Sequence, residues 1–152
     1  IVAKIGSIML DLERVEKGTW VKHPSGVRLC VASINSKSYK QAREIALRPR
    51  LRDIRSGALT YDDISEILKP VAAEHLLLGW SDLEDENGQP IPYSPSKALA
   101  YFQDPRFGEF YRFILDAAGE AELYRQDLLE DSAKNSPKSS SGSSPGDSKK
   151  SS

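Results

Sequence analysis

Histidine, cysteine and clustered carboxylates are the side chains in this sequence that could carry catalytic or metal-binding chemistry. The chain has two histidines, His23 and His75, and a single cysteine, Cys30. No second histidine or cysteine lies three or four residues from His75, as a metal pair on one helix face would require. Cys30 lies in a β-rich run, where burial would keep its thiol protonated and unreactive. We therefore expect no catalytic residues, no metal and no cofactor, and we interpret the protein as non-enzymatic.

The acidic segment 82–92 has some features of a calcium-binding loop. An EF-hand loop needs a glycine at its sixth position and a glutamate at its twelfth. Counted from Asp82, these positions hold Asn87 and Tyr93. We interpret the segment as a solvated loop, with Asn87-Gly88 as its tight turn.

Charge is distributed unevenly along the chain, although the formal net charge is only -1. Residues 1–57 carry 12 basic and 5 acidic side chains, and residues 58–135 carry 6 basic and 16 acidic ones. Opposite charges of this kind can attract within one chain or head to tail between copies. The strongest basic cluster contains Arg43, Arg48, Arg50, Arg52 and Arg55. These arginines either contact phosphates or an acidic partner, or they form a solvated helix end that pairs with the acidic half of the fold.

The elements that must position these side chains begin with a β-hairpin. Two β-rich runs flank the turn-forming sequence His23-Pro-Ser-Gly26, which predicts a hairpin at about residues 19–34. Both faces of the second run are mostly apolar, so we expect both to be covered. A lone hairpin is marginal in water, and residues 1–10, an N-terminal extension, are a candidate third strand.

Residues 36–133 are predicted to be helical. One helix runs from Ser38 to about Leu47, where Pro49 ends or kinks it. A second, capped by Thr60 or Asp62, continues through Leu78 to Gly79, with a kink or break at Pro70. Ser94-Pro95 and Asp104-Pro105 begin further helices, and a last one reaches about Ala133. The side chains expected in the core of this part are Phe107, Phe110, Tyr111 and Ile114, with Phe113 as an exposed anchor.

These patterns predict an α+β, mainly α fold. A β-hairpin or small sheet near the N-terminus packs on a compact bundle of about five helices, within one globular domain at residues 11–133. The Ser- and Gly-rich residues 134–152 lack apolar side chains, so we predict a disordered tail. No apolar run approaches the roughly 20 residues needed to cross a bilayer, and we expect no membrane contact.

A resemblance to a known family lies between Val71 and about Asn135. The sequences Glu74-His-Leu-Leu-Leu-Gly-Trp80 and Glu84-Asp-Glu-Asn-Gly-Gln-Pro-Ile-Pro-Tyr-Ser94, followed by a helix and Asp104-Pro-Arg-Phe107, carry it. In this order they resemble the tail assembly chaperones of long-tailed, siphovirus-like bacteriophages. The hairpin and the helix after Tyr39 fit the same layout, so the resemblance covers about residues 20–135.

The resemblance implies a non-catalytic chaperone that binds the phage tape measure protein, keeps it soluble and helps recruit the tail tube protein. It also implies action in the host bacterial cytoplasm and absence from the mature virion. We further expect self-association and no nucleic-acid partner. Gly79, Trp80, Pro90, Pro92 and Tyr93 either position the acidic loop or contact the partner. The predicted partner-binding residues are Arg43, Arg48, Arg50, Arg52, Arg55, Trp80, Tyr93 and Phe113.

Two other classes remain open at this point. A structural virion protein of the tail tube or head-tail connector would persist in purified particles. A small nucleic-acid-associated regulator would use the basic N-terminal part, and its binding would weaken steeply with salt.

Overall fold

A computed structural model describes residues 2–126 of the 152-residue chain, which fall into two compact units. One unit is Leu12–Tyr124, and the other contains the described ends of the chain, up to Asp11 and from Arg125. In the second unit, Ile5–Ile8 form the 3-10 turn η1, and the Gln126 N–H donates to the Met9 carbonyl at 2.9 Å. The predicted disordered tail, 134–152, and the end of the last predicted helix, 127–133, lie outside the described residues.

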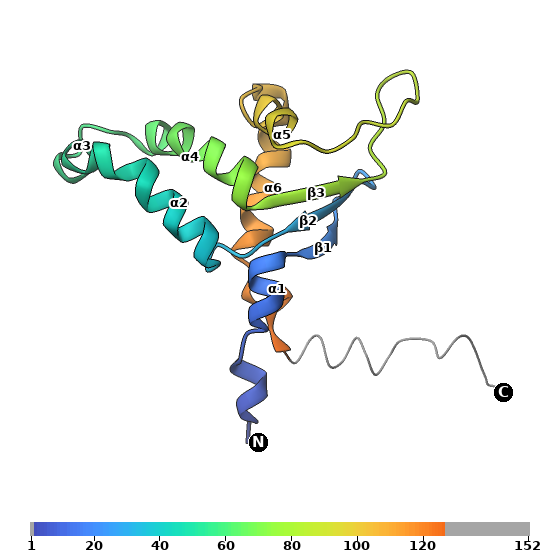
Figure 1. Ribbon diagram of the computed structural model, residues 1–152, viewed down its shortest axis with the longest axis horizontal. Coiled ribbons are helices and arrows are strands. Elements are labelled where there is room, and N and C mark those ends of the chain that lie inside the picture. The colour runs from blue at the N-terminus through green and yellow to red at the C-terminus, as the bar shows by residue number, and fades with distance from the viewer. Residues whose placement is uncertain (1, 127–152) are drawn as a thin grey trace. The chain divides into compact units, whose positions relative to one another are not determined.

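The unit Leu12–Tyr124 is mainly helical and contains one small sheet, which confirms the predicted α+β class (Figure 1). Its elements in chain order are α1 (Leu12–Lys17), β1 (Thr19–Lys22), β2 (Arg28–Val31), α2 (Lys37–Leu47), η2 (Arg48–Arg50), α3 (Leu51–Ser56), α4 (Tyr61–His75), β3 (Leu77–Ser81), α5 (Pro95–Phe102), η3 (Pro105–Phe107), α6 (Gly108–Ala118) and η4 (Ala121–Tyr124).

The sheet is antiparallel, with strand order β1-β2-β3. The predicted hairpin is confirmed: the His23 N–H donates to the Val27 carbonyl at 2.9 Å, and the Gly26 N–H donates to the His23 carbonyl at 2.8 Å. Gly26 has a φ of 106°, a conformation that a side chain disfavours. The turn therefore depends on a glycine at this position.

The third strand comes from the sequence that we predicted to end a helix, and both that prediction and the candidate strand at residues 1–10 are wrong. Helix α4 ends at His75, and Leu77–Ser81 pairs with β2. The apolar run Leu76–Leu78 satisfies a helical period and a strand period equally well. Pairing decides the outcome, because β2 needs a second neighbour and both Leu76 and Leu77 become fully buried.

The starts of α4 and α5 and the end of α2 follow local sequence closely. Thr60 and Asp63 form a capping box at the start of α4, and Ser94 accepts a hydrogen bond from the Lys97 N–H at the start of α5. Helix α2 ends at Leu47, just before Pro49, as predicted. Pro70 does not divide α4 into two helices; it lies inside one continuous helix on an exposed position.

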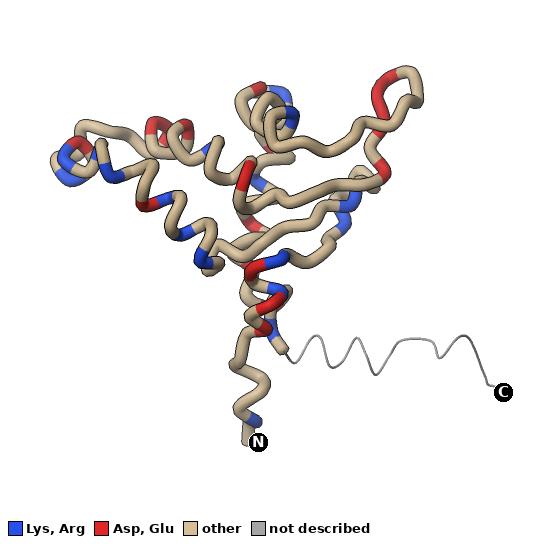
Figure 2. The backbone as a smooth tube through the Cα atoms, in the orientation of Figure 1, with Lys and Arg blue, Asp and Glu red and all other residues tan. Residues whose placement is uncertain are grey.

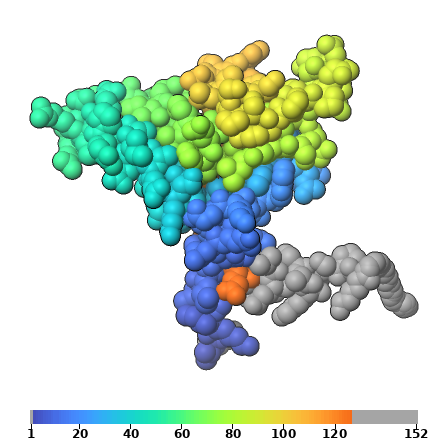
Figure 3. All heavy atoms as spheres, viewed as in Figure 1, coloured from blue at the N-terminus to red at the C-terminus, as the bar shows by residue number. Residues whose placement is uncertain are grey.

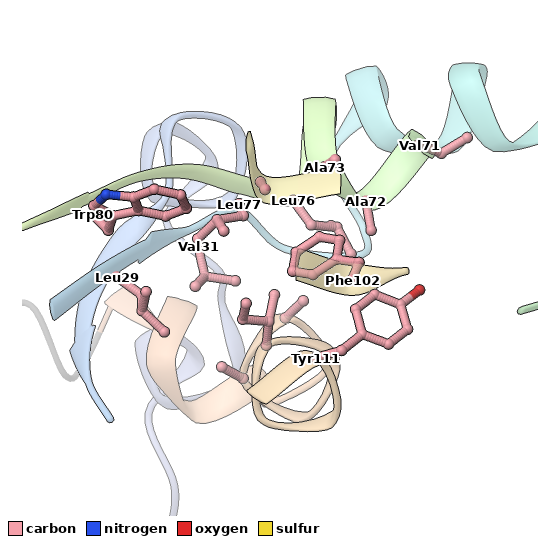
Figure 4. Packing of buried hydrophobic residues seen from close by; sticks show 14 of the residues in the cluster. Leu29, Val31, Val71, Ala72, Ala73, Leu76, Leu77, Trp80, Phe102 and Tyr111 are labelled. Atoms are coloured by element: carbon pink, nitrogen blue, oxygen red, sulfur yellow. The ribbon is translucent and has the colours of Figure 1, made fainter. Parts of the chain in front are cut away.

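The core lies against one face of the sheet, where α6 packs (Figure 4). Leu29 and Val31 of β2 and Ile114 of α6 are all fully buried. After α6, residues Ala121–Tyr124 form the 3-10 turn η4, where the sequence predicted part of the last α-helix. Tyr124 of this turn is 1% exposed, and its hydroxyl donates to the Val31 carbonyl at 2.8 Å. This buried anchor holds the segment against the strand.

The opposite face of the sheet is not fully covered, contrary to our prediction. Trp20 is 50% exposed on this face, opposite Cys30 of β2 in the strand register. A Cβ atom placed on Gly79 would lie 3.8 Å from the Trp20 ring. The two tryptophans of the chain therefore occupy opposite faces, since Trp80 is only 7% exposed on the core side.

Candidate functional site

A cleft of about 450 Å³ lies between the hairpin turn, the loop 82–92 and the segment from α5 to α6. In Figure 3 this loop projects beside α5. Apolar and aromatic side chains form much of the cleft lining, and carboxylates stand among them. We call it the aromatic cleft; its apolar members are Val27, Leu83, Ile91, Tyr101, Phe107 and Phe110, and its acidic members are Glu84, Asp85, Glu86 and Glu109.

One wall is the acidic loop, which Asp85 orders from within. An Asp85 carboxylate oxygen accepts hydrogen bonds from the N–H groups of Asn87 and Gln89, at 2.8 and 2.9 Å. The Gly88 N–H donates to the Asp85 carbonyl, and Gly88 has a φ of 79°. The predicted Asn87-Gly88 turn is confirmed, and it orders the loop that carries the rim carboxylates.

Two aromatic residues attach this wall to the core. The Trp80 indole N–H donates to the Ile91 carbonyl at 2.8 Å, and the Tyr93 hydroxyl donates to the carbonyls of Ala73 and Leu77. The rings of Trp80 and Tyr93 meet edge to face, with centroids 5.0 Å apart. Burial raises the pKa of the Tyr93 hydroxyl, which is the donor in both contacts. Both residues position the loop, which was one of their two predicted roles.

The opposite wall is a row of aromatic rings. Tyr101 stacks on Phe107 with centroids 4.8 Å apart and planes 25° apart, and Trp80 lies 5.8 Å from Tyr101 on the inner side. Asp104 begins η3 by accepting a hydrogen bond from the Arg106 N–H. The Arg106 guanidinium, which also lines the cleft, pairs with Asp104 at 2.7 Å and lowers the pKa of that carboxyl.

His23 closes the cleft at the hairpin turn. Its Nδ1 accepts a hydrogen bond from the Ser25 N–H at 3.1 Å, so the ring proton lies on Nε2, which donates to a Glu109 carboxylate oxygen at 3.2 Å. The ring also meets Phe110 and Phe113 edge to face. His23 therefore joins the turn between the first two strands to α6, and its contacts are structural.

The cleft suits a segment that is apolar and positively charged. Its aromatic surface would bury an aliphatic or aromatic side chain, and its carboxylates would attract flanking lysines or arginines. Arg106 is the cation among the lining residues, and its charge is offset by Asp104. The cleft volume lies within the range of roughly 300–1,000 Å³ typical of binding pockets.

The predicted arginine cluster lies elsewhere in the unit, around the end of α2, η2 and α3. We call this segment the basic arm; it carries Arg43, Arg48, Arg50, Arg52 and Arg55. Arg43 and Arg48 line a second hollow with Leu51, and the Arg43 guanidinium lies 5.6 Å from the Tyr39 ring centroid. The structure thus brings these arginines together on one segment, apart from the aromatic cleft.

The other predicted site residues occupy less accessible positions. Trp80 is 7% exposed, while Tyr93 and Phe113 are partly buried against the core. Phe107 and Phe110, predicted to be core residues, line the cleft at partly exposed positions. Sequence reasoning missed Tyr101 and Glu109 as lining residues. The i, i+3 spacing of Phe107 and Phe110 was visible, but nothing local indicated which side would remain open.

The histidines, the cysteine and the acidic side chains were the sequence's candidates for catalytic or metal-binding chemistry. His75 Nδ1 contacts the Ser38 hydroxyl, but the nearest Glu74 carboxylate oxygen is 3.8 Å from the other ring nitrogen, beyond hydrogen-bonding distance. Burial raises the pKa of the Cys30 thiol. Among residues 2–126 no three His, Cys, Asp or Glu side chains converge as metal ligands would. Within the same range, no helix combines the length and apolarity of a membrane span.

Comparison with protein families assigns the chain to a phage-derived group. The model of the YdaY prophage protein family matches residues 34–135, about two thirds of the chain. The chain belongs to this family. The matched region contains the basic arm, the acidic loop and the α5–α6 wall of the cleft, but not the hairpin turn. No curated protein and no solved structure matches the chain.

Proposed function

We propose that this prophage protein is a non-catalytic chaperone of tail assembly, which covers an apolar helical segment of the phage tape measure protein. In this role it acts in the host bacterial cytoplasm, keeps the tape measure protein soluble until tail tube subunits assemble around it, and is absent from the finished virion. Membership of a prophage family supports the phage context. The resemblance to tail assembly chaperones supports the narrower role.

The observation that carries the proposal is that the residues of the resemblance build the aromatic cleft. Trp80 and Tyr93 anchor the acidic loop, and Asn87-Gly88 forms its turn. Asp104 begins the turn that brings Phe107 into the opposite wall. The motifs thus build the cleft, which supports a binding role.

The physical basis is the burial of exposed apolar surface. A long helical protein that awaits assembly exposes apolar side chains, which drive aggregation unless another protein covers them. A helix that presents one apolar face can place a side chain in the cleft, with its basic residues against the rim carboxylates. Each large apolar side chain buried in this way contributes roughly 1.5–3 kcal/mol.

Co-expression with the tape measure protein of the same prophage tests the proposal. The intact chain should increase the soluble fraction of the tape measure protein severalfold. Phe107→Ala, which removes a ring from the cleft wall, should lose most of this effect. Tyr61→Ala is the matched control, because Tyr61 is 93% exposed and lies outside the cleft.

Two results would contradict the proposal. One is equal solubility of the tape measure protein with and without the chain. The other is recovery of the chain at structural stoichiometry from washed phage particles, which would favour a tail tube or connector component instead.

A further inference from the structure

We infer that the aromatic cleft also receives the basic arm of a second copy of this chain, so that copies join head to tail while no client is bound. This inference rests on the proposed function, because it concerns what covers the cleft before the tape measure protein arrives. It specifies the two surfaces, whereas the charge distribution of the sequence indicated only that copies could attract.

The basic arm has the chemistry of the expected cleft ligand. Ile45 is 63% exposed and Leu51 is 40% exposed, so aliphatic side chains stand among the arginines. Arg48 pairs with Glu44 at 3.5 Å, and Arg50 pairs with Asp53 at 3.4 Å; the first pair is largely exposed and the second is about half exposed. Such surface pairs are weak and can exchange partners.

Two further arginines of the arm are more available to a partner. Arg52 and Arg55 are exposed, and within residues 2–126 neither belongs to a recorded ion pair. The arm therefore presents apolar side chains together with guanidinium groups that can meet carboxylates.

The cleft is complementary to the arm in its apolar surface and in its charge. Its carboxylates at Glu84, Glu86 and Glu109 are on exposed residues, and the aromatic rings between them are only partly covered. An arm seated in the cleft would place an aliphatic side chain against Tyr101, Phe107 and Phe110. Its arginines would then lie beside the acidic loop and Glu109. Charge complementarity thus selects the arm of a second copy as the occupant.

The positions of the two surfaces exclude pairing within one copy. In Figures 1 and 2, α3 with its basic residues and the loop 82–92 with its acidic residues lie at opposite edges of the same unit. A contact from arm to cleft must therefore join two molecules. It uses different patches on the two partners, which leaves a free arm and a free cleft at the ends of each chain of copies. A client helix would compete for the same cleft and disassemble the chain.

Sedimentation velocity over a concentration series of the full chain, at about 50 mM salt, tests the inference. The protein should associate, and the association should weaken at about 500 mM salt, where exposed charges are screened. Glu84→Lys with Glu86→Lys should weaken association at least about tenfold, and so should Arg52→Glu with Arg55→Glu. Asp116→Lys with Glu120→Lys, an equal charge change outside both surfaces, should leave association unchanged.

Mixing the two charge-reversal variants, Glu84→Lys with Glu86→Lys and Arg52→Glu with Arg55→Glu, is the decisive step. In each variant alone, the substituted residues face residues of the same charge on the partner surface, whereas an equimolar mixture lets the introduced glutamates meet the introduced lysines. Association should return in the mixture. The intact chain remaining monomeric at low salt, or the mixture failing to associate when both proteins are folded by circular dichroism, would overturn the inference.

A separate readout distinguishes this inference from the proposed function. Arg52→Glu with Arg55→Glu leaves the cleft intact, so this variant should still keep the tape measure protein soluble. Soluble client without self-association of the intact chain would reject the inference alone. Self-association with no effect on client solubility would reject the proposed function alone.

Discussion

The aromatic cleft and the basic arm both surround a hollow with charged side chains, but they are built in different ways. The cleft combines residues from three separated stretches, 23–27, 83–91 and 101–110, and hydrogen bonds between residues 11 to 20 positions apart, such as Trp80 to Ile91 and Tyr93 to Ala73, hold its loop. The arm is a nearly continuous helical stretch, and its ion pairs join residues three or four positions apart. The cleft therefore depends on the folded core, and the arm depends mainly on local helix formation.

This difference predicts where substitutions change stability and where they change only binding. Removal of a residue that anchors the cleft should lower the free energy of unfolding substantially, because these residues are buried and join separate segments. Substitution of charged residues in the arm should hardly change the free energy of unfolding of the isolated protein, but it should weaken association.

The largest effect on stability is expected from a comparison of the two tryptophans. Trp80→Ala removes a buried ring and its hydrogen bond to Ile91, and it should lower the free energy of unfolding by about 3–5 kcal/mol. Trp20→Ala, on the open face of the sheet, should cost about 1 kcal/mol or less. Urea unfolding followed by far-ultraviolet circular dichroism measures both. Equal losses would show that the cleft wall does not depend on its buried anchor.

A smaller effect is expected at high pH from Tyr111, which belongs to the core under α4 and α6. Burial raises its pKa from 10 to about 12, whereas an unfolded tyrosine titrates near 10. The stability that this difference contributes is complete below pH 10. It is lost as the pH rises from 10 to 12, because the unfolded chain releases the proton first.

The variant Tyr111→Phe measures this contribution. Between pH 10 and 12 it should lose about 2–3 kcal/mol less stability than the intact chain does. Urea midpoints at several pH values provide the comparison. Tyr61→Phe, at a 93% exposed position, should follow the intact chain. Parallel curves for the intact chain and Tyr111→Phe would contradict the prediction.

The smallest effect on stability is expected in the arm. Arg52→Gln with Arg55→Gln should change the free energy of unfolding by less than about 0.5 kcal/mol, since both side chains are exposed. Thermal unfolding checks this. A loss of several degrees would mean that the arm supports the fold, and the contrast with the cleft would then disappear.

Local features of the fold were predictable from the sequence, and features that depend on pairing were not. The caps at Thr60 and Ser94 and the turn at Asn87-Gly88 follow from neighbours within four residues. The strand at Leu77–Ser81 was missed because an apolar run suits either a helix or a strand until a partner strand is present. Residues Ala121–Tyr124, predicted to belong to the last α-helix, form the 3-10 turn η4 instead, and the Tyr124 hydroxyl reaches the Val31 carbonyl, a contact across 93 positions in the sequence.

The candidate site shows the same division. The arginine cluster was found because its members are close in sequence. The aromatic cleft was not found, because Tyr101 and Glu109 become lining residues only when the fold places His23 and the acidic loop beside them.

The amino-acid sequence by itself determined the mainly helical α+β character, the capped starts of α4 and α5, the hairpin turn and the separation of basic from acidic residues. These depend on backbone preferences and on charges that each residue carries in any conformation. Only the tertiary structure decided which strand completes the sheet, which tryptophan is buried and where carboxylates meet aromatic rings. Such outcomes require segments distant in sequence to compete for the same buried surface, and that competition is settled by packing.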